Sequence, residues 1–256
     1  MRLFAVPALA DNYIWVAADD GGHALAVDPG EAAPLEALLQ REGLALTALL
    51  LTHHHPDHIA GAAELAQRHP GLRILAPDDD RIAVPGERVH DGQQIELMAP
   101  KARFQVLAVP GHTRSHVAYA GEGLLFCGDT LFSLGCGRLF EGTPAQMLES
   151  LERLAGLAGE TQVCCGHEYT VANAAFARAV DPHNGALLQR LAEAQALRAE
   201  GRPSVPSTLA GERAANPFLR IDAPALRDWA RRHAPDAVDR VERFAALRTA
   251  KDSFRA

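Results

Sequence analysis

Residues 52–58 read Thr-His-His-His-Pro-Asp-His and follow an apolar run over residues 46–51. If that run is a strand, His53 and His55 lie on the same side, because alternate residues of a strand face one way. Asp57 and His58 then fall in the turn that follows. Imidazole and carboxylate together, without thiolate, are typical of a catalytic rather than a structural metal site. The pattern therefore predicts a metal site at the end of a strand.

A histidine-rich tract can also be an expression tag or a loose metal-binding run, and a lone histidine is more often a surface or core residue than a ligand. Tags sit at termini, and they do not interpose an aspartate at a fixed step between a strand and a helix. We therefore interpret the cluster over residues 53–58 as a metal site. Five other histidines are assigned to the ordinary surface or core class: His23, His69, His90, His183 and His233.

Three further apolar runs end at a glycine next to a potential ligand. Residues 106–109 precede Gly111 and His112, residues 124–127 precede Gly128 and Asp129, and residues 161–165 precede Gly166 and His167. Each of these is ordinary turn chemistry when taken alone. Four such strand-end clusters in order along one chain are hard to explain as turns, so we expect them to form a common site.

The four motifs resemble those of the metallo-β-lactamase superfamily: T-H-x-H-x-D-H at 52–58, G-H-T at 111–113, G-D-T at 128–130 and G-H-E at 166–168. Within it, the chain is similar to the glyoxalase II (hydroxyacylglutathione hydrolase) family. The matching segments are D-N-Y at 11–13, D-P-G at 28–30, C-G-D-T-L-F at 127–132, G-C-G-R-L-F-E-G-T at 135–143, C-G-H-E-Y-T at 165–170 and the ending over 247–254. The resemblance runs nearly from end to end.

The resemblance implies an α+β fold, an αββα sandwich of two sheets between helices, with a C-terminal helical domain. Short Val, Leu and Ile runs between Gly and Pro turns fill the chain up to about residue 170, with helical patterns at 34–41, 57–69 and 144–157. After Thr170 the strands are expected to stop. Helices are predicted there over 171–180, 185–200, 223–233 and 236–248, with a Pro-rich linker at 201–206. We expect a catalytic domain over 1–170 and a substrate-binding domain over 171–256.

By resemblance, the site holds two divalent ions per chain, with zinc favoured and iron or manganese as alternatives. One ion would be held by His53, His55 and His112, the other by Asp57, His58 and His167, and Asp129 would bridge them. Asp57, His58 and Asp129 are also the expected catalytic residues. A hydroxide between the ions would attack a thioester carbonyl and release glutathione as a thiolate.

The resemblance also implies a glutathione site that contains Arg138, Phe140, Tyr169, Arg248 and Lys251. Cations at the mouth of the site would hold a glutathione carboxylate by charge-assisted hydrogen bonds. The family often has Tyr where this chain has Phe140, so that contact is expected to be packing only. The implied reaction is hydrolysis of S-(2-hydroxyacyl)glutathione, such as S-D-lactoylglutathione, to D-lactate and glutathione in methylglyoxal detoxification.

Composition agrees with an enzyme acting on a small molecule. The 256 residues carry a formal net charge of −7, which argues against nucleic acid as a partner, since phosphate binding needs a basic footprint. No run approaches the roughly 20 apolar residues of a membrane span, and the N-terminal stretch does not fit a signal peptide. Four cysteines without C-x-x-C spacing predict reduced thiols in a cytoplasmic protein. We expect the protein to be a monomer.

Three alternatives stay open at this point. The same ligands could serve a hydrolase of another thioester or of a lactone. A persulfide dioxygenase also resembles the superfamily but uses a single iron. A binding module without turnover could keep the fold, although a set of seven ligands argues against it.

Overall fold

The computed structural model describes residues 1–255 and divides into two compact units. The first unit consists of residues 1–108, 115–128 and 164–168. The second consists of residues 109–114, 129–163 and the described chain from Tyr169 onward. Each unit therefore combines segments that are distant in the sequence.

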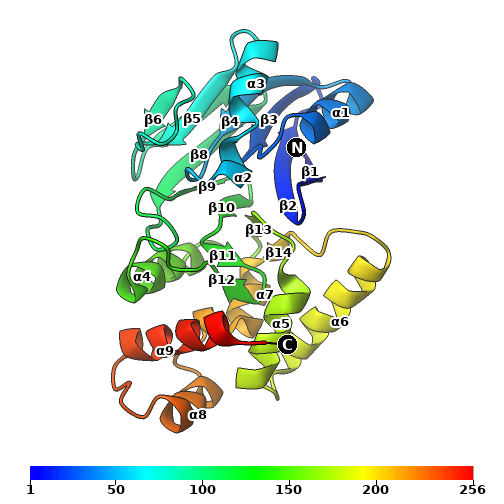
Figure 1. Ribbon diagram of the computed structural model, residues 1–256. Helices are drawn as coiled ribbons and strands as arrows, with labels where there is room; N and C mark the ends of the chain where they lie inside the picture. The colour runs from blue at the N-terminus through cyan, green and yellow to red at the C-terminus, as the bar shows by residue number, and fades with distance from the viewer. Residues whose placement is uncertain (256) are drawn as a thin grey trace. The chain divides into compact units, whose positions relative to one another are not determined.

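The first sheet of the first unit has six strands in sequence order (Figure 1): β1 (Arg2–Ala8), β2 (Asn12–Ala18), β3 (His23–Val27), β4 (Ala45–Leu50), β5 (Arg73–Pro77) and β6 (Glu87–Val89). The pairs β1–β2 and β2–β3 are antiparallel, and the pairs from β3 to β6 are parallel. Every residue of β2 is buried. Because alternate residues of a strand face opposite sides, both faces of the sheet are covered at β2.

Helices cover one face of this sheet. Helix α1 (Ala33–Glu42) buries Leu35, Leu38 and Leu39, a stripe at helical spacing, and α3 (Ala62–Arg68) adds Ala62 and Leu65 to the same core cluster. The prediction of a single helix over 57–69 is wrong, because α2 spans only Pro56–Ile59. Ala60 and Gly61 separate α2 from α3. A Cβ atom on Gly61 would lie 2.6 Å from the backbone carbon of Glu31.

The second sheet lies against the other face of the first. Its order in the first unit is β13 (Gln162–Cys165), β10 (Leu124–Gly128), β9 (Val117–Gly121), β8 (Lys101–Ala108) and β7 (Gln94–Met98). The Tyr119 hydroxyl on β9 lies 2.9 Å from the Leu51 carbonyl oxygen and 3.2 Å from that of Leu75. Burial raises the pKa of Tyr119, so the phenol stays protonated and ties the two sheets together.

The second unit is mainly helical. Its elements are β11 (Leu131–Phe132), β12 (Gly135–Cys136), α4 (Pro144–Ala155), α5 (Thr170–Val180), α6 (Gly185–Ala199), β14 (Ser207–Thr208), α7 (Leu209–Ala215), the short 3-10 helix η1 (Pro217–Leu219), α8 (Pro224–His233) and α9 (Arg240–Ser253). In Figure 1, α5 and α6 run side by side, and their buried faces share a core cluster with Leu134.

Two sequence expectations need correction here. Strands do not stop after Thr170, because β14 pairs with the first residues of β13; a two-residue strand leaves too little alternation to be recognised. The last helix begins at Arg240 rather than 236, because the Asp239 carboxylate accepts a hydrogen bond from the Glu242 backbone and caps it. The predicted start of α4 is confirmed, with Thr143 as the capping residue.

Aromatic rings join α5 and α9, two helices that contribute residues to one pocket. The Phe218 ring centroid lies 6.1 Å from that of Phe176 on α5 and 5.9 Å from that of Phe244 on α9. The Arg248 guanidinium lies over the Phe218 ring, 5.3 Å from its centroid. This aromatic cluster fixes the position of α9 beneath the pocket.

Candidate functional site

The first unit gathers five of the predicted ligands at strand ends. His53 and His55 follow β4, Asp57 and His58 belong to α2, and His167 follows β13. The turn that bears Asp57 packs closely on Gly30, where a Cβ atom would lie 2.1 Å from the Asp57 carbonyl oxygen. Only glycine fits there, which explains the glycine of the D-P-G segment.

Asp57, His58 and His167 form a group that could hold a metal ion, with potential ligand atoms within 4.8 Å of one another. Asp57 Oδ2 lies 3.5 Å from His58 Nε2 and 3.4 Å from His167 Nε2. In a tetrahedral zinc site with bonds of about 2.0–2.1 Å, two ligand atoms are about 3.3 Å apart. The donor set and its spacing therefore fit a divalent cation.

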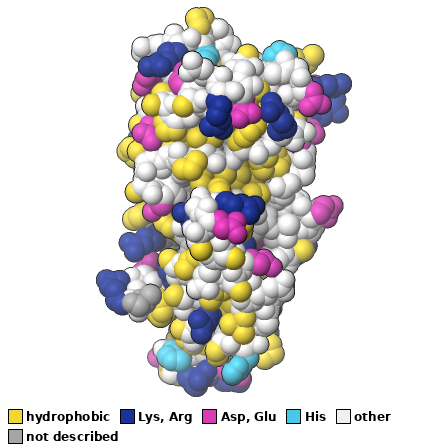
Figure 2. Space-filling view, turned by 90° about the vertical axis from the view of Figure 1, so that its right-hand side faces the viewer, with side chains coloured by type: hydrophobic (Ala, Val, Ile, Leu, Met, Phe, Trp, Pro, Cys, Tyr) yellow, Lys and Arg dark blue, Asp and Glu magenta, His cyan; other side chains and the backbone are white. Residues whose placement is uncertain are grey.

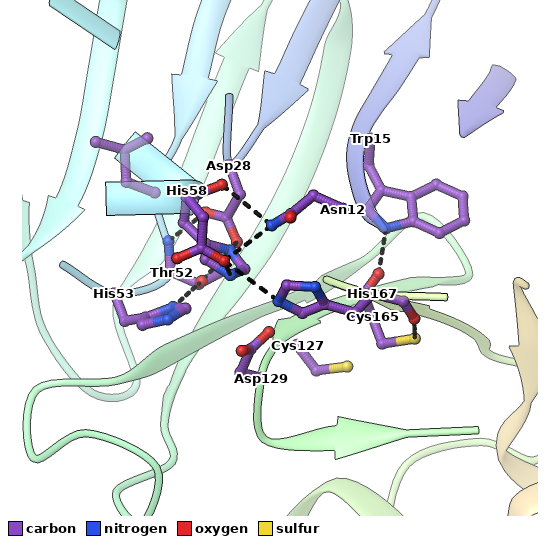
Figure 3. Close-up of polar contacts among 12 residues, drawn as sticks. Asn12, Trp15, Asp28, Thr52, His53, His58, Cys127, Asp129, Cys165 and His167 are labelled. Carbon is purple, nitrogen blue, oxygen red and sulfur yellow. Dashed lines mark hydrogen bonds and ion pairs between the residues drawn. The ribbon is translucent and has the colours of Figure 1, made fainter. Parts of the chain in front are cut away.

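A buried carboxylate orients two of the imidazoles (Figure 3). Asp28 Oδ2 lies 3.0 Å from His58 Nδ1 and 2.6 Å from the Thr52 hydroxyl oxygen. Because the Thr52 hydroxyl donates its single proton to Asp28, its oxygen accepts from His53 Nδ1, 3.0 Å away. Both imidazoles are thus protonated on Nδ1, which leaves Nε2 as the nitrogen for a metal.

Asp28 could also be counted with His53 and His58 as a possible ligand group. Its two oxygens, however, accept from the Thr52 backbone nitrogen, the Thr52 hydroxyl and His58 Nδ1. We therefore assign Asp28 to orienting the ligands rather than to binding the ion.

The second unit holds the remaining two predicted ligands, His112 and Asp129. His112 Nε2 lies 3.5 Å from Asp129 Oδ2, again the edge of a tetrahedral site. His112 Nδ1 donates to the Arg138 carbonyl oxygen, 2.9 Å away. A Cβ atom on Gly137 would lie 1.9 Å from the Asp129 carbonyl oxygen, so the G-C-G segment owes its second glycine to this close approach.

A pocket of about 400 Å³ in the second unit brings the predicted substrate residues together with these two ligands. The predicted residues that line it are His112, Asp129, Arg138, Phe140, Tyr169, Arg248 and Lys251. All five predicted glutathione contacts thus face one cavity.

The three cations of the pocket differ in their surroundings. The Arg138 side chain is 63% exposed. Arg248 is buried and donates to the Cys136 carbonyl oxygen and to Asp252, at 2.8 and 2.9 Å. Burial lowers the pKa of Lys251, and the neighbouring charges of Arg248 and Arg138 lower it further. Arg248 is therefore part of the wall, whereas Lys251 would gain most from an anion in the pocket.

The two aromatic residues line the pocket in different ways. Phe140 is 62% exposed, and its ring meets the His112 ring edge-on at 5.3 Å. The Tyr169 ring packs on Phe132 at 5.2 Å. Phe140 therefore offers the pocket an apolar surface beside a candidate ligand.

Sequence reasoning missed several residues of the site. Phe132, Cys136, Ala172 and Asn173 also line the pocket. Asn173 is a buried amide between the apolar residues Val171, Ala172 and Ala174 of α5, and it donates to the Ser133 carbonyl oxygen. A polar residue in that apolar setting was a usable signal. Asp28 lay in a segment quoted for the resemblance, but its contacts with Thr52 and His58 depend on the fold.

Charged side chains of both signs lie on the face drawn in Figure 2. Lys and Arg side chains are interspersed there with Asp and Glu side chains. Over residues 1–255, we find no helix with the length and apolar character required to cross a bilayer.

Two family models match the chain, one after the other. Residues 7–167 match the metallo-beta-lactamase superfamily, and residues 168–254 match the hydroxyacylglutathione hydrolase C-terminus. A hydroxyacylglutathione hydrolase of Xanthomonas campestris pv. campestris (strain B100) is 56% identical over the full length of both chains. The enzyme of that name from Stenotrophomonas maltophilia (strain R551-3) is 52% identical, again over all of both chains.

Solved structures share the fold. The BLEG-1 B3 metallo-beta-lactamase is 23% identical with a TM-score of 0.65, covering 86% of this chain and all of that one. ETHE1 from Myxococcus xanthus is 24% identical with a TM-score of 0.65, covering 98% and 97%. The predicted metallo-β-lactamase fold with a C-terminal helical region is confirmed, and the chain belongs to the hydroxyacylglutathione hydrolase family of the metallo-β-lactamase superfamily.

Proposed function

We propose that this chain hydrolyses the thioester of S-(2-hydroxyacyl)glutathione, such as S-D-lactoylglutathione, to a 2-hydroxy acid and glutathione. This is the second step of methylglyoxal detoxification. The observation that carries the proposal is the pocket of the second unit, in which two candidate ligands and five candidate glutathione contacts line one cavity. Full-length relatives named hydroxyacylglutathione hydrolase support the same substrate class.

The proposed metal site has two divalent ions. One is assigned to His53, His55 and His112, the other to Asp57, His58 and His167, with Asp129 as the bridge. The spacings of 3.4 and 3.5 Å within the Asp57 group support this assignment. So does TTHA1623, solved in a di-iron-bound form, which is 30% identical with a TM-score of 0.56 over 64% of this chain and 91% of that one.

Zinc is the favoured metal, with iron or manganese as alternatives, because imidazole and carboxylate ligands suit all three. When bound, the two ions supply a hydroxide nucleophile near neutral pH and polarise the thioester carbonyl. Asp57, His58 and Asp129 act in catalysis by holding these ions at the reacting group. The leaving thiolate has an ordinary thiol pKa of about 8.5, so it departs without a strong general acid.

Substrate binding is assigned to the pocket. Lys251 and Arg138 receive glutathione carboxylates by charge-assisted hydrogen bonds. Phe140 and Tyr169 pack against the ligand. Arg248, which is buried against Cys136 and Asp252, supports the binding wall and adds positive charge.

We further propose that residues 1–170 act as the catalytic domain and residues 171–256 as the substrate-binding domain. The protein is proposed to act as a monomer in the cytoplasm, without nucleic acid or membrane partners. The alternatives of a persulfide dioxygenase and of a lactone hydrolase are not favoured, because the 52–56% identical relatives are named as hydroxyacylglutathione hydrolases.

The substrate class is tested by comparing two thioesters. The chain has two lysines, Lys251 in the pocket and Lys101 on the exposed end of β8, so Lys101→Ala is a matched control for Lys251→Ala. A charge-assisted hydrogen bond contributes about 1.5–3 kcal/mol, and we take the lower end because Lys251 is half-buried. Lys251→Ala should raise KM for S-D-lactoylglutathione about 10-fold.

The thioester of a small uncharged thiol cannot use this contact, so wild type and Lys251→Ala should hydrolyse it equally. Lys101→Ala should match wild type on both substrates. Equal losses on both thioesters, or no loss on either, would remove the assignment of glutathione and leave a hydrolase of another thioester.

A further inference from the structure

The D-N-Y segment at residues 11–13 has no role in the proposed function, although it ends the β1–β2 turn and begins β2 beside the ligand cluster. Its backbone pairs with the strand-end segment that carries His167. Asn12 and His167 form an antiparallel bridge, the Tyr13 nitrogen donates to Gly166, and the Glu168 nitrogen donates to Asp11, both at 2.8 Å. The turn is thus joined by main-chain hydrogen bonds to both neighbours of a ligand.

All three side chains of the segment then contact the ligands or a neighbour of one. Asp11 Oδ1 lies 2.8 Å from His167 Nδ1. Asn12 Nδ2 donates to Asp57 Oδ2 at 3.0 Å, and the Tyr13 hydroxyl donates to Glu168 at 2.8 Å. Figure 3 shows Asn12 pointing toward the cluster that includes His58 and His167.

The residue types match what each ligand needs. His167 must be protonated on Nδ1 for its Nε2 to bind an ion, and the Asp11 carboxylate accepts that proton and raises the basicity of the ring. The Asp57 carboxylate must stay anionic, with Oδ2 oriented toward the ion. Asn12 does this by donating to that carboxylate without adding a charge of either sign.

Asp57 Oδ2, which accepts from Asn12, is also the oxygen that lies 3.4 and 3.5 Å from the two Nε2 atoms. A carboxylate oxygen has two lone pairs. The amide therefore holds the carboxylate in the orientation that places Oδ2 beside both Nε2 atoms. Asn12 is only 7% exposed, so water cannot readily replace its amide.

We propose that Asp11 and Asn12 are positioning residues that set the affinity of the ion held by Asp57, His58 and His167. The proposal rests on the binuclear site of the proposed function. Asp11 and Asn12 should therefore affect the affinity for one of the two ions more than for the other, in addition to any contribution to the fold.

Two isosteric exchanges test this role with zinc as the probe. Asn12→Asp replaces the donor by a second carboxylate, which repels Asp57. Asp11→Asn keeps an acceptor but removes the charge. Loss of such partners typically lowers metal affinity 10- to 100-fold. We expect about 100-fold for Asn12→Asp and about 10-fold for Asp11→Asn, because the Asp11 side chain is 43% exposed.

The matched control is Asp19→Asn at the next hairpin turn, where Asp19 lies 3.3 Å from His23 Nδ1, away from the ligands. For all four proteins, zinc affinity is measured by competition with a chromophoric chelator, which resolves the two ions. The unfolding midpoint of the metal-stripped protein is measured in parallel.

We expect both variants to bind one of the two ions more weakly and the other as in wild type. The unfolding midpoints of metal-stripped Asp11→Asn and of the metal-stripped control should stay at the wild-type value. If Asp11→Asn keeps wild-type affinity for both ions, or weakens both ions equally, the proposal is wrong even if Asn12→Asp fails to fold. A wild-type chain that takes up a single zinc ion would instead overturn the proposed function itself.

Discussion

The ligand cluster of the first unit and the pocket of the second are built differently. In the cluster, His53, His58 and His167 are buried and each has a hydrogen-bonded Nδ1. In the pocket, Arg138 and Phe140 remain mostly exposed. Metal ligands need fixed geometry, whereas a flexible substrate can be held by side chains that move. Substitutions in the cluster should therefore change metal content, and substitutions in the pocket should change KM.

Asp129 gives the strongest test of this difference, because it lines the pocket but is assigned as a ligand of both ions. Asp129→Ala should lower zinc content and turnover together. We expect a loss in kcat/KM of more than about 100-fold, since even an outer partner of a ligand contributes 10- to 100-fold. Elemental analysis and turnover on the same sample are the measurements. Near wild-type turnover would mean that Asp129 is only a turn residue.

Asp28→Asn tests how much a buried carboxylate that orients ligand imidazoles contributes to zinc affinity. Asp28 has a φ of 52°, a conformation that Asn tolerates well, so Asp28→Asn changes the charge with little strain. We expect zinc affinity to fall by about 10-fold or more, with KM for any remaining loaded enzyme near wild type. A raised KM with unchanged zinc affinity would show that the ligand cluster does not act through metal binding alone.

Lys251 should make substrate binding in the pocket depend on pH. Burial and the charges of Arg248 and Arg138 lower its pKa below the ordinary lysine value of about 10.4. The protonated amine binds an anion, so KM for S-D-lactoylglutathione should rise as pH increases through the lowered pKa. Lys251→Arg should shift this rise to higher pH, because arginine stays charged. KM profiles that coincide for wild type and Lys251→Arg would exclude Lys251 as the group responsible.

Phe140 should give the smallest effect. Phe140→Tyr adds a hydroxyl at a position 62% exposed, where a hydrogen bond contributes at the low end of about 0.5–1.5 kcal/mol. We expect KM for the glutathione thioester to fall about 2-fold and zinc content to stay constant. Steady-state kinetics with a parallel metal assay decide this, and a change in zinc content would show that the pocket wall is not independent of the ligands.

The same contrast explains what could be predicted from the sequence. Ligand types at the ends of apolar runs are local signals, so His112, Asp129 and His167 could be predicted from motifs. The same is true of His53, His55, Asp57 and His58. The orienting contacts could not, because Asp28 and Thr52 meet only when β3 and β4 pair. Arg248 could not be distinguished from Lys251 either, since its burial against Cys136 depends on how α9 packs.

The number of metal ions that thioester hydrolysis requires can be measured by adding zinc stepwise to chelator-treated protein. S-D-lactoylglutathione turnover and bound zinc are followed on the same sample. We expect close to two zinc ions to bind per chain, with full activity only when both are bound. Full activity with a single zinc ion bound per chain would show that the second ion is not needed and that the two-ion mechanism is wrong.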